Sequence, residues 1–197
     1  MPDWSAITKA LREAGIHVAA GAAPRAVGGG DISAAWRLET DEVPVFVKTG
    51  PPSSADMFTA EAEGLAELAA PQAIRVPGVI ACGCEGSTAF LAIDWLDFER
   101  PTRETEARLG RQLAELHRTT RDRYGWHRDN TIGLTPQHND WSDDWVEFFG
   151  RQRLGFQLEL AAGKGFSGSL QDQGARLLER LPALFEDYVP AASLLHG

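Results

Sequence analysis

The stretch Val45-Phe46-Val47-Lys48 consists of β-branched and aromatic residues and ends in a lysine, a composition that predicts a β-strand. Upstream, the glycine cluster of residues 27–33 predicts a turn between two further strands. Downstream, the spacing of apolar residues predicts a helix over 54–70, followed by strands over 76–84 and 89–93. The first half of the chain is therefore expected to be rich in strands.

The second half of the chain has a helical pattern instead. From Glu104 onward, leucines recur on one helical face, and Trp141, Trp145 and Phe148 follow at positions i, i+4 and i+7, which predicts another helix. A further helix is predicted over 170–181, and a short helix over 4–14 precedes the strands.

This order predicts an α+β protein with two lobes. We place the strand-rich lobe at residues 1–97 and the helical lobe at residues 98–197, with the joint within 94–103. A cleft between two such lobes is a common place for a ligand.

Composition excludes several classes of protein. With 197 residues, 43% hydrophobic and 24% charged, the chain is expected to fold without disulfides. A net charge of −9 disfavours binding to nucleic acid or to an anionic membrane. We expect no signal peptide, no transmembrane segment, and Cys82 and Cys84 as reduced thiols, which together indicate the cytoplasm. The sequence leaves the oligomeric state open.

Lys48 is one of only three lysines, and its position at the end of a strand suits contact with nucleotide phosphates. Such a lysine needs an acidic partner on the next helix, where Glu61 and Glu63 are candidates. Glu61 follows the apolar Phe58 by three positions and so shares its face, whereas Glu63 is expected to point elsewhere. The alternative is a lysine that extends to solvent from a strand end.

Gly28, Gly29 and Gly30 would let backbone N–H groups approach a phosphate. The segment is neither a Walker A loop nor a dinucleotide-binding fingerprint, because no Gly-Lys-Ser/Thr follows and the third glycine position is Ser33. A plain hairpin turn explains the same three glycines.

Three other features are less specific. Residues 100–128 carry eight arginines and four acidic residues, which fits an acidic partner or simply the solvated face of a helix. Residues 124–141 form a polar, aromatic loop that either shapes a sugar-sized pocket or only joins helices. The histidines match no metal-binding spacing, so no metal ligand is assigned.

Taken together, these segments resemble the fructosamine kinase (ketosamine 3-kinase) family, which is related to aminoglycoside and choline kinases. The similarity runs almost end to end. The matching segments are Gly28–Ser33, Val45–Lys48, Met57–Glu61, Leu109–His117, Asp129–Asn130, Thr135–Gln137, Trp141–Phe149, Arg153–Leu154, Gln157–Leu158 and Leu194–Gly197.

The resemblance implies a protein-kinase-like fold with ATP and Mg²⁺ as cofactors, and phosphorylation of a small ketoamine or a glycated protein amine at the sugar 3-hydroxyl, which leads to deglycation. Lys48 and Glu61 would be the catalytic pair, and the three glycines would cover the phosphates. Trp95, Leu96 and Asp97 would line the adenine site.

In the family, His-Gly is followed by a catalytic Asp and then by metal ligands, whereas this chain stops at Gly197. We therefore expect an incomplete C-terminal lobe and no turnover by the 197 residues alone. Two alternatives stay open: a kinase for an aminoglycoside or an amino alcohol such as choline, and a fragment that binds nucleotide without catalysis.

Overall fold

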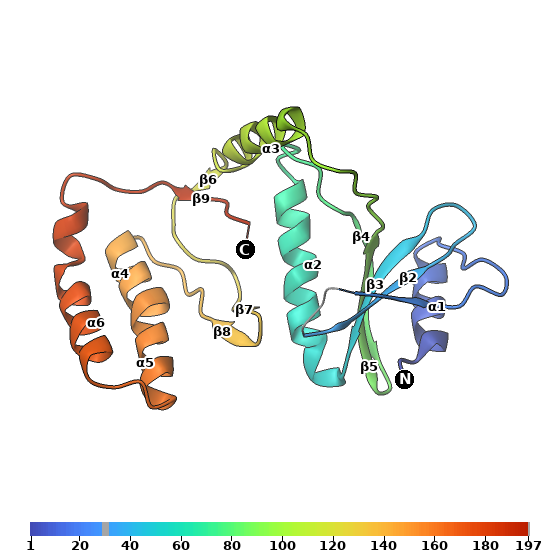
Figure 1. Ribbon diagram of the computed structural model, residues 1–197, viewed down its shortest axis with the longest axis horizontal. Helices are drawn as coiled ribbons and strands as arrows, with labels where there is room; N and C mark the ends of the chain where they lie inside the picture. The colour runs from blue at the N-terminus through green and yellow to red at the C-terminus, as the bar shows by residue number, and fades with distance from the viewer. Residues whose placement is uncertain (29–31, 197) are drawn as a thin grey trace. The chain divides into compact units, whose positions relative to one another are not determined.

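The computed structural model describes residues 1–28 and 32–196, which form two compact units (Figure 1). The first unit is Met1–Leu116 together with His196, and the second is His117–Leu195. The division therefore falls after Leu116, whereas the sequence placed the lobe boundary between residues 97 and 98. Residues 103–116, which form a single helix, are counted with the first unit.

The first unit is built on one antiparallel sheet with the strand order β1-β2-β3-β5-β4. Its strands are β1 (Arg25–Val27), β2 (Ala34–Leu38), β3 (Val45–Gly50), β4 (Val79–Glu85) and β5 (Thr88–Asp94). Helices α1 (Trp4–Glu13) and α2 (Ala55–Ala69) lie on opposite sides of the strands, and the short 3₁₀-helix η1 (Pro52–Ser54) leads into α2 (Figure 1).

Helix α1 covers one face of this sheet. The Asp3 carboxylate caps the helix by accepting hydrogen bonds from the backbone N–H groups of Ser5 and Ala6. Ile7 and Leu11, one turn apart, are fully buried and belong to one core cluster with residues of β2, β3 and β5. The helix predicted over 4–14 is confirmed.

Helix α2 covers the other face, and it confirms the helix predicted over 54–70. Phe58 is fully buried and packs with Leu91 and Ile93 of β5. Since Phe90 and Ala92 belong to the α1 cluster, successive residues of β5 serve opposite cores.

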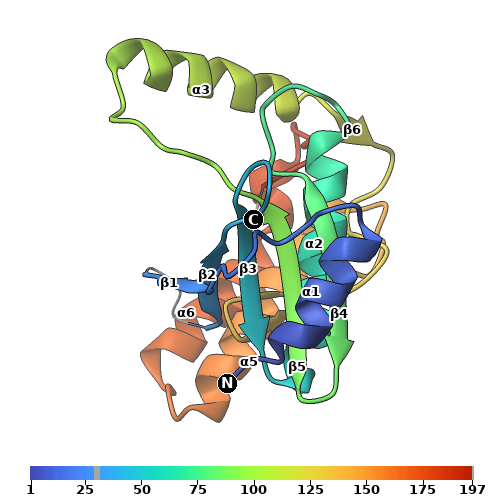
Figure 2. The same ribbon diagram turned by 90° about the vertical axis from the view of Figure 1, so that its right-hand side faces the viewer.

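Helix α3 (Arg103–Leu116) is exposed along most of its length, and in Figure 2 it stands apart from the sheet. Of the leucines predicted to share one helical face, Leu116 is buried, Leu113 is half-buried and Leu109 is 49% exposed. The helix itself was predicted correctly.

The second unit combines two small antiparallel ribbons with helices. The ribbons pair β6 (Thr120–Arg121) with β9 (Ala192–Ser193) and β7 (Asn130–Ile132) with β8 (Thr135–Gln137). The helical segments are α4 (Trp145–Phe149), the π-helix η2 (Gly150–Gly155), α5 (Phe156–Gly163), α6 (Ser169–Arg180) and the 3₁₀-helix η3 (Pro182–Phe185).

The predicted helix that was to include Trp141 starts later than expected, at Trp145. The Asp144 side chain caps this helix by accepting from the backbone N–H of Glu147 at 2.7 Å. Just before it, Ser142 pairs with Tyr124 in an isolated β-bridge, so residue 142 is not helical. The spacing of Trp141, Trp145 and Phe148 therefore predicted the start of this helix too early, at Trp141 instead of Trp145.

The core of the second unit gathers around the helices. Phe148, Leu181 and Tyr124 are buried, and the Tyr124 hydroxyl donates a hydrogen bond to the Pro190 carbonyl. Helix α6 approaches α5 closely at Gly174.

Over the described part of the chain, no helix combines the length and the apolar character that a membrane crossing requires.

Two glycines inside helices are expected to respond oppositely to alanine. At Gly174 a Cβ would lie 2.4 Å from Leu158 Cδ2, so Gly174→Ala should lower the free energy of unfolding by about 1–3 kcal/mol. At Gly110 in α3 no atom lies within 4 Å, so Gly110→Ala should raise the free energy of unfolding by about 0.5–1 kcal/mol. Urea unfolding followed by circular dichroism measures both, and shifts of the same sign would contradict this packing.

Candidate functional site

Lys48 is held by the pleat of the central strand β3. Val45, Val47 and Thr49 are buried on one face of the strand, so Phe46 and Lys48 project from the other. Phe46 packs with the α2 cluster, which places the lysine on the α2 side of the sheet.

On that side, Lys48 Nζ donates a hydrogen bond to Glu61 Oε1 of α2 at 2.6 Å. The two side chains are 29% and 31% exposed, so the ion pair forms at the edge of a core and remains reachable from solvent. The pairing of Lys48 with Glu61, one turn after the buried Phe58, was predicted from the sequence and is present. An ion pair of this kind fixes the extended lysine side chain.

The described ends of strands β1 and β2 lie close to Lys48 in the sheet. Ala35 of β2 lies opposite Val27 of β1 on one side and opposite Lys48 of β3 on the other. The end of the β1–β2 hairpin is therefore only one strand away from Lys48. Gly28 precedes the turn, whereas Gly29 and Gly30 lie outside the described residues.

The segment after β5 carries the other three predicted site residues. Trp95 and Leu96 are half-buried and Asp97 is exposed, and Trp95 Nε1 donates to Asp97 Oδ1 at 2.8 Å. The centroids of the Trp95 and Phe46 rings lie 6.2 Å apart. The Arg37 guanidinium lies over the Trp95 ring, 4.8 Å from its centroid. Phe46 projects on the same face as Lys48, so Trp95 borders that face too.

The chemistry of these groups fits a phosphate better than a metal ion. A positioned ammonium group such as that of Lys48 is suited to bind phosphate oxygens. Among the residues the structure describes, no group of three His, Cys, Asp or Glu side chains is placed to hold a metal ion.

Cys82 and Cys84 are free and exposed, and desolvation raises the pKa of the Cys82 thiol.

In the second unit, the loop of residues 128–139 is fixed by a polar network around Asn139, which is only 4% exposed. Asn139 Nδ2 donates to the Arg128 carbonyl at 3.1 Å and to Asn130 Oδ1 at 2.9 Å. Asn139 Oδ1 accepts from Arg153 at 2.7 Å, and Arg153 also donates to the His138 carbonyl at 2.5 Å. Burial lowers the pKa of the Arg153 guanidinium. The negative charge of Asp129 acts in the opposite direction and raises this pKa, but less strongly.

Asp129 supports the same loop from its start. Its Oδ2 lies 2.7 Å from His138 Nδ1, and its Oδ1 accepts from the backbone N–H of Asn139 at 2.9 Å. These hydrogen bonds, with His138 the largest contribution, lower the pKa of Asp129. These side-chain hydrogen bonds thus hold the ends of the β7–β8 ribbon, which forms the middle of the loop.

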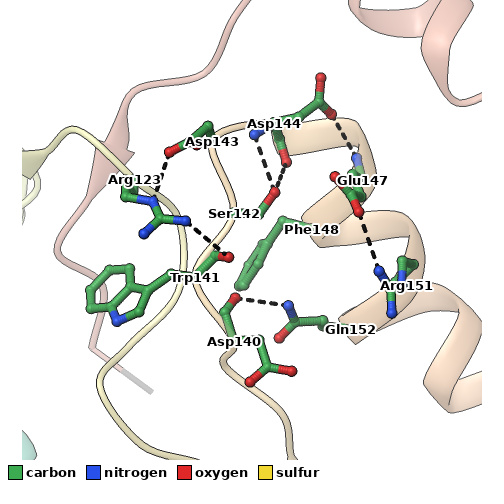
Figure 3. Close-up of a pocket in the computed structure, with 10 residues that line it drawn as sticks. All are labelled: Arg123, Asp140, Trp141, Ser142, Asp143, Asp144, Glu147, Phe148, Arg151 and Gln152. Atoms are coloured by element: carbon green, nitrogen blue, oxygen red, sulfur yellow. Dashed lines mark hydrogen bonds and ion pairs between the residues drawn. The ribbon is translucent and has the colours of Figure 1, made fainter.

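Beside this loop, the second unit has a pocket of about 310 Å³. Figure 3 shows the ten residues that line it. They are Arg123, Asp140, Trp141, Ser142, Asp143, Asp144, Glu147, Phe148, Arg151 and Gln152.

The structure thus brings together Lys48 and Glu61, with Gly28 and Trp95 bordering the same sheet. The sequence did not indicate the anchoring role of Arg153 or the contact between Gln152 and Asp140. No local pattern marks these residues, since their partners lie 12 to 15 positions away in the chain.

Residues 3–197 match the model of a family described as fructosamine kinase. A Synechocystis sp. protein named a probable ketoamine kinase is 40% identical over 88% of this chain. The chloroplastic protein-ribulosamine 3-kinase of Arabidopsis thaliana is also 40% identical, over 87%. The chain spans 58% and 53% of the lengths of these two relatives, respectively.

Solved structures show the same fold. A candidate fructosamine-3-kinase from Haemophilus somnus superposes with a TM-score of 0.82 at 26% identity, covering 95% of this chain and 63% of that one. A second candidate fructosamine-3-kinase, from Thermobifida fusca, superposes with a TM-score of 0.80 at 28% identity. The match covers 97% of this chain and 66% of that one. The predicted α+β, protein-kinase-like fold is confirmed.

The contribution of Asp129 to the free energy of unfolding should depend on pH. Because its folded pKa is lowered, Asp129 stabilises the fold above its unfolded pKa of about 3.9, and this contribution is lost as pH falls through the folded value. Asp129→Asn should therefore lower the free energy of unfolding at pH 6, and the difference between parent and variant should shrink as the pH falls below about 3.9. Urea unfolding across this range tests it, and a difference that does not change with pH would contradict it.

Proposed function

This chain belongs to the fructosamine kinase family, and we propose that it forms the nucleotide-binding part of a kinase that transfers the γ-phosphoryl group of ATP to a ketoamine. The observation that carries the proposal is the 2.6 Å ion pair between Lys48 and Glu61 on the α2 face of the sheet.

The lysine has a simple physical task in this proposal. Its ammonium group neutralises charge on the α- and β-phosphates, and Glu61 keeps the side chain extended toward them. Because the pair is about one-third exposed, the lysine can exchange part of its contact with Glu61 for a phosphate oxygen. Gly28, Gly29 and Gly30 cover the phosphates with backbone N–H groups.

The base of the nucleotide is assigned to the segment after β5. Trp95, Leu96 and Asp97 follow directly from a buried strand, and the half-buried Trp95 and Leu96 provide apolar surface there. We assign recognition of adenine to main-chain groups of these three residues, so their side chains contribute shape more than specificity.

ATP supplies the phosphoryl group, and Mg²⁺ is proposed to accompany it. The described residues contain no cluster that would hold the metal ion, so no metal ligand is assigned to this chain. We likewise assign no residue of it as the base that accepts the hydroxyl proton. The proposal for the 197 residues is nucleotide binding, and turnover is proposed only for a longer protein with the extent of the relatives.

The finer assignment follows the family. We propose the sugar 3-hydroxyl of a fructosamine or ribulosamine as acceptor, free or attached to a protein amine, so that the product decomposes and releases the amine. The name of the Arabidopsis thaliana relative, protein-ribulosamine 3-kinase, supports a protein-bound substrate and position 3. We propose the cytoplasm as the location.

Binding of nucleotide without catalysis is the second candidate function of the chain. The Lys48–Glu61 pair favours it, since this pair can hold a nucleotide while a metal cluster is lacking among residues 1–28 and 32–196.

Substitutions at the ion pair test nucleotide binding. Lys48→Ala should weaken ATP binding about tenfold or more, because a charge-assisted hydrogen bond to phosphate is lost. Glu61→Gln should weaken it less, since the lysine remains but is less well positioned. Glu63→Gln, two positions along the same helix, is the control and should bind ATP within about twofold of the parent.

Calorimetric titration of ATP into the 197-residue chain measures these affinities, and thermal unfolding checks that each variant is folded. Equal affinity of the folded Lys48→Ala variant and the parent would overturn the assignment of this site.

ADP release distinguishes the candidate functions. The 197-residue chain should bind ATP without releasing ADP when offered fructosyl-lysine, an aminoglycoside or choline. A longer protein that contains these 197 residues and has the extent of the relatives should release ADP with fructosyl-lysine and not with the other two acceptors. Release with the aminoglycoside or choline alone would instead establish the related small-molecule kinase activity.

A further inference from the structure

The pocket of about 310 Å³ in the second unit carries an excess of negative charge. Its lining includes four carboxylates and two guanidinium groups, a net charge of −2. The acidic residues are Asp140, Asp143, Asp144 and Glu147, and the basic ones are Arg123 and Arg151.

Most of these charges are already compensated. Arg123 Nε lies 2.7 Å from Asp143 Oδ1, and Arg151 lies 3.2 Å from Glu147 Oε1. Asp144 caps the N-terminus of α4, where the helix dipole favours a negative charge. The Asp140 carboxylate is different, because it makes no ion pair or hydrogen bond within the part of the chain that is described.

Next to Asp140, the Gln152 side chain adds a second unmatched acceptor. Gln152 Nε2 donates to the Asp140 carbonyl at 2.8 Å, which fixes the orientation of the amide, since a carbonyl accepts only from the nitrogen (Figure 3). Gln152 Oε1 is consequently turned away from that bond, and it is buried with no hydrogen-bond partner. A buried acceptor without a donor is unfavourable.

The ligand that such a pocket favours is an organic cation rather than a metal ion. No three carboxylate, histidine or cysteine side chains of the described residues converge on a metal position, and 310 Å³ is at the lower end of volumes typical of small-molecule sites. The rings of Trp141 and Phe148 also line the pocket, and aromatic faces attract cations and pack against sugar rings. The Arg121 guanidinium already lies 5.9 Å from the Trp141 ring.

We propose that this pocket binds the protonated amine of an aminated sugar, with Asp140 as the counter-ion of the ammonium group and Trp141 as the surface on which the ligand packs. The inference rests on the proposed ketoamine substrate, whose secondary amine is positively charged near neutral pH. It adds a recognition element for the nitrogen end of that substrate. Asp140 and Trp141 are specificity residues in this proposal, and no chemical step is assigned to them.

Three probes separate the contributions of charge and sugar. Nα-acetyl-fructosyl-lysine carries the sugar and a single charged nitrogen, fructose lacks the nitrogen, and Nα-acetyl-lysine lacks the sugar. The parent chain should bind the first probe most tightly, and higher salt should weaken this binding because the attraction is partly screened.

The variants then test Asp140 directly. Asp140→Asn should weaken binding of Nα-acetyl-fructosyl-lysine about fivefold, the upper range for one exposed charge pair, and Asp140→Lys should abolish it. Neither substitution should change the affinity for fructose or for ATP. Asp187→Asn removes an exposed acid of the same unit outside the pocket, so it should leave all affinities unchanged.

Calorimetry gives these affinities, and thermal unfolding confirms that each variant is folded. The inference is overturned if folded Asp140→Asn and Asp140→Lys variants bind the acetylated ketoamine as the parent does, or if the parent binds fructose equally well. If a longer protein phosphorylates the ketoamine with a KM that Asp140→Asn does not change, the inference fails while the proposed function stands. If binding depends on Asp140 but no ketoamine is phosphorylated, the proposed function fails while the cation site stands.

Discussion

The pleat of β3 is the constraint on which the first unit depends. Val45 and Val47 face α1, and Phe46 and Lys48 face α2, so a single strand contributes to both cores and also positions the lysine. A slip of one residue in the pairing of β3 would reverse these directions and place the lysine in the α1 core. The same burial that stabilises the sheet therefore determines where the ammonium group lies.

In the second unit, the π-helix η2 has a comparable role. Its wider turn allows the adjacent residues Gln152 and Arg153 both to reach back to the loop, at the carbonyls of Asp140 and His138. The turn requires Gly155, because a Cβ there would lie 2.7 Å from the Gly150 carbonyl oxygen. One irregular helical turn thereby supports the ordered loop and the wall of the pocket together.

The sequence was sufficient where local patterns decide the structure. Strand composition and apolar spacing located β3, α1 and α2, and the three-residue step from Phe58 selected Glu61 over Glu63 as the partner of Lys48. The helix expected to include Trp141 was wrong at its start, because hydrogen bonds of Ser142 and Asp144 set the helix boundary and hydrophobic spacing does not report them. The network of Asn139 and Arg153 was not foreseeable, since it joins residues that only the folded chain brings together. The roles of Lys48, Glu61, the glycines and the segment Trp95–Asp97 in nucleotide binding remain predictions.

Strand β4 ends the sheet opposite to β1, so one side of its backbone has no neighbouring strand within it. Free strand edges are where folded chains associate into larger sheets and aggregate. This edge is not regular, since its register with β5 shifts between Val79 and Ala81, and its start is tied by hydrogen bonds between Gly78 and Asp94. Such an irregularity bends the strand, so its backbone pairs poorly with a regular edge strand of another molecule. The shift in β4 is therefore a built-in protection against sheet-to-sheet aggregation at high protein concentration.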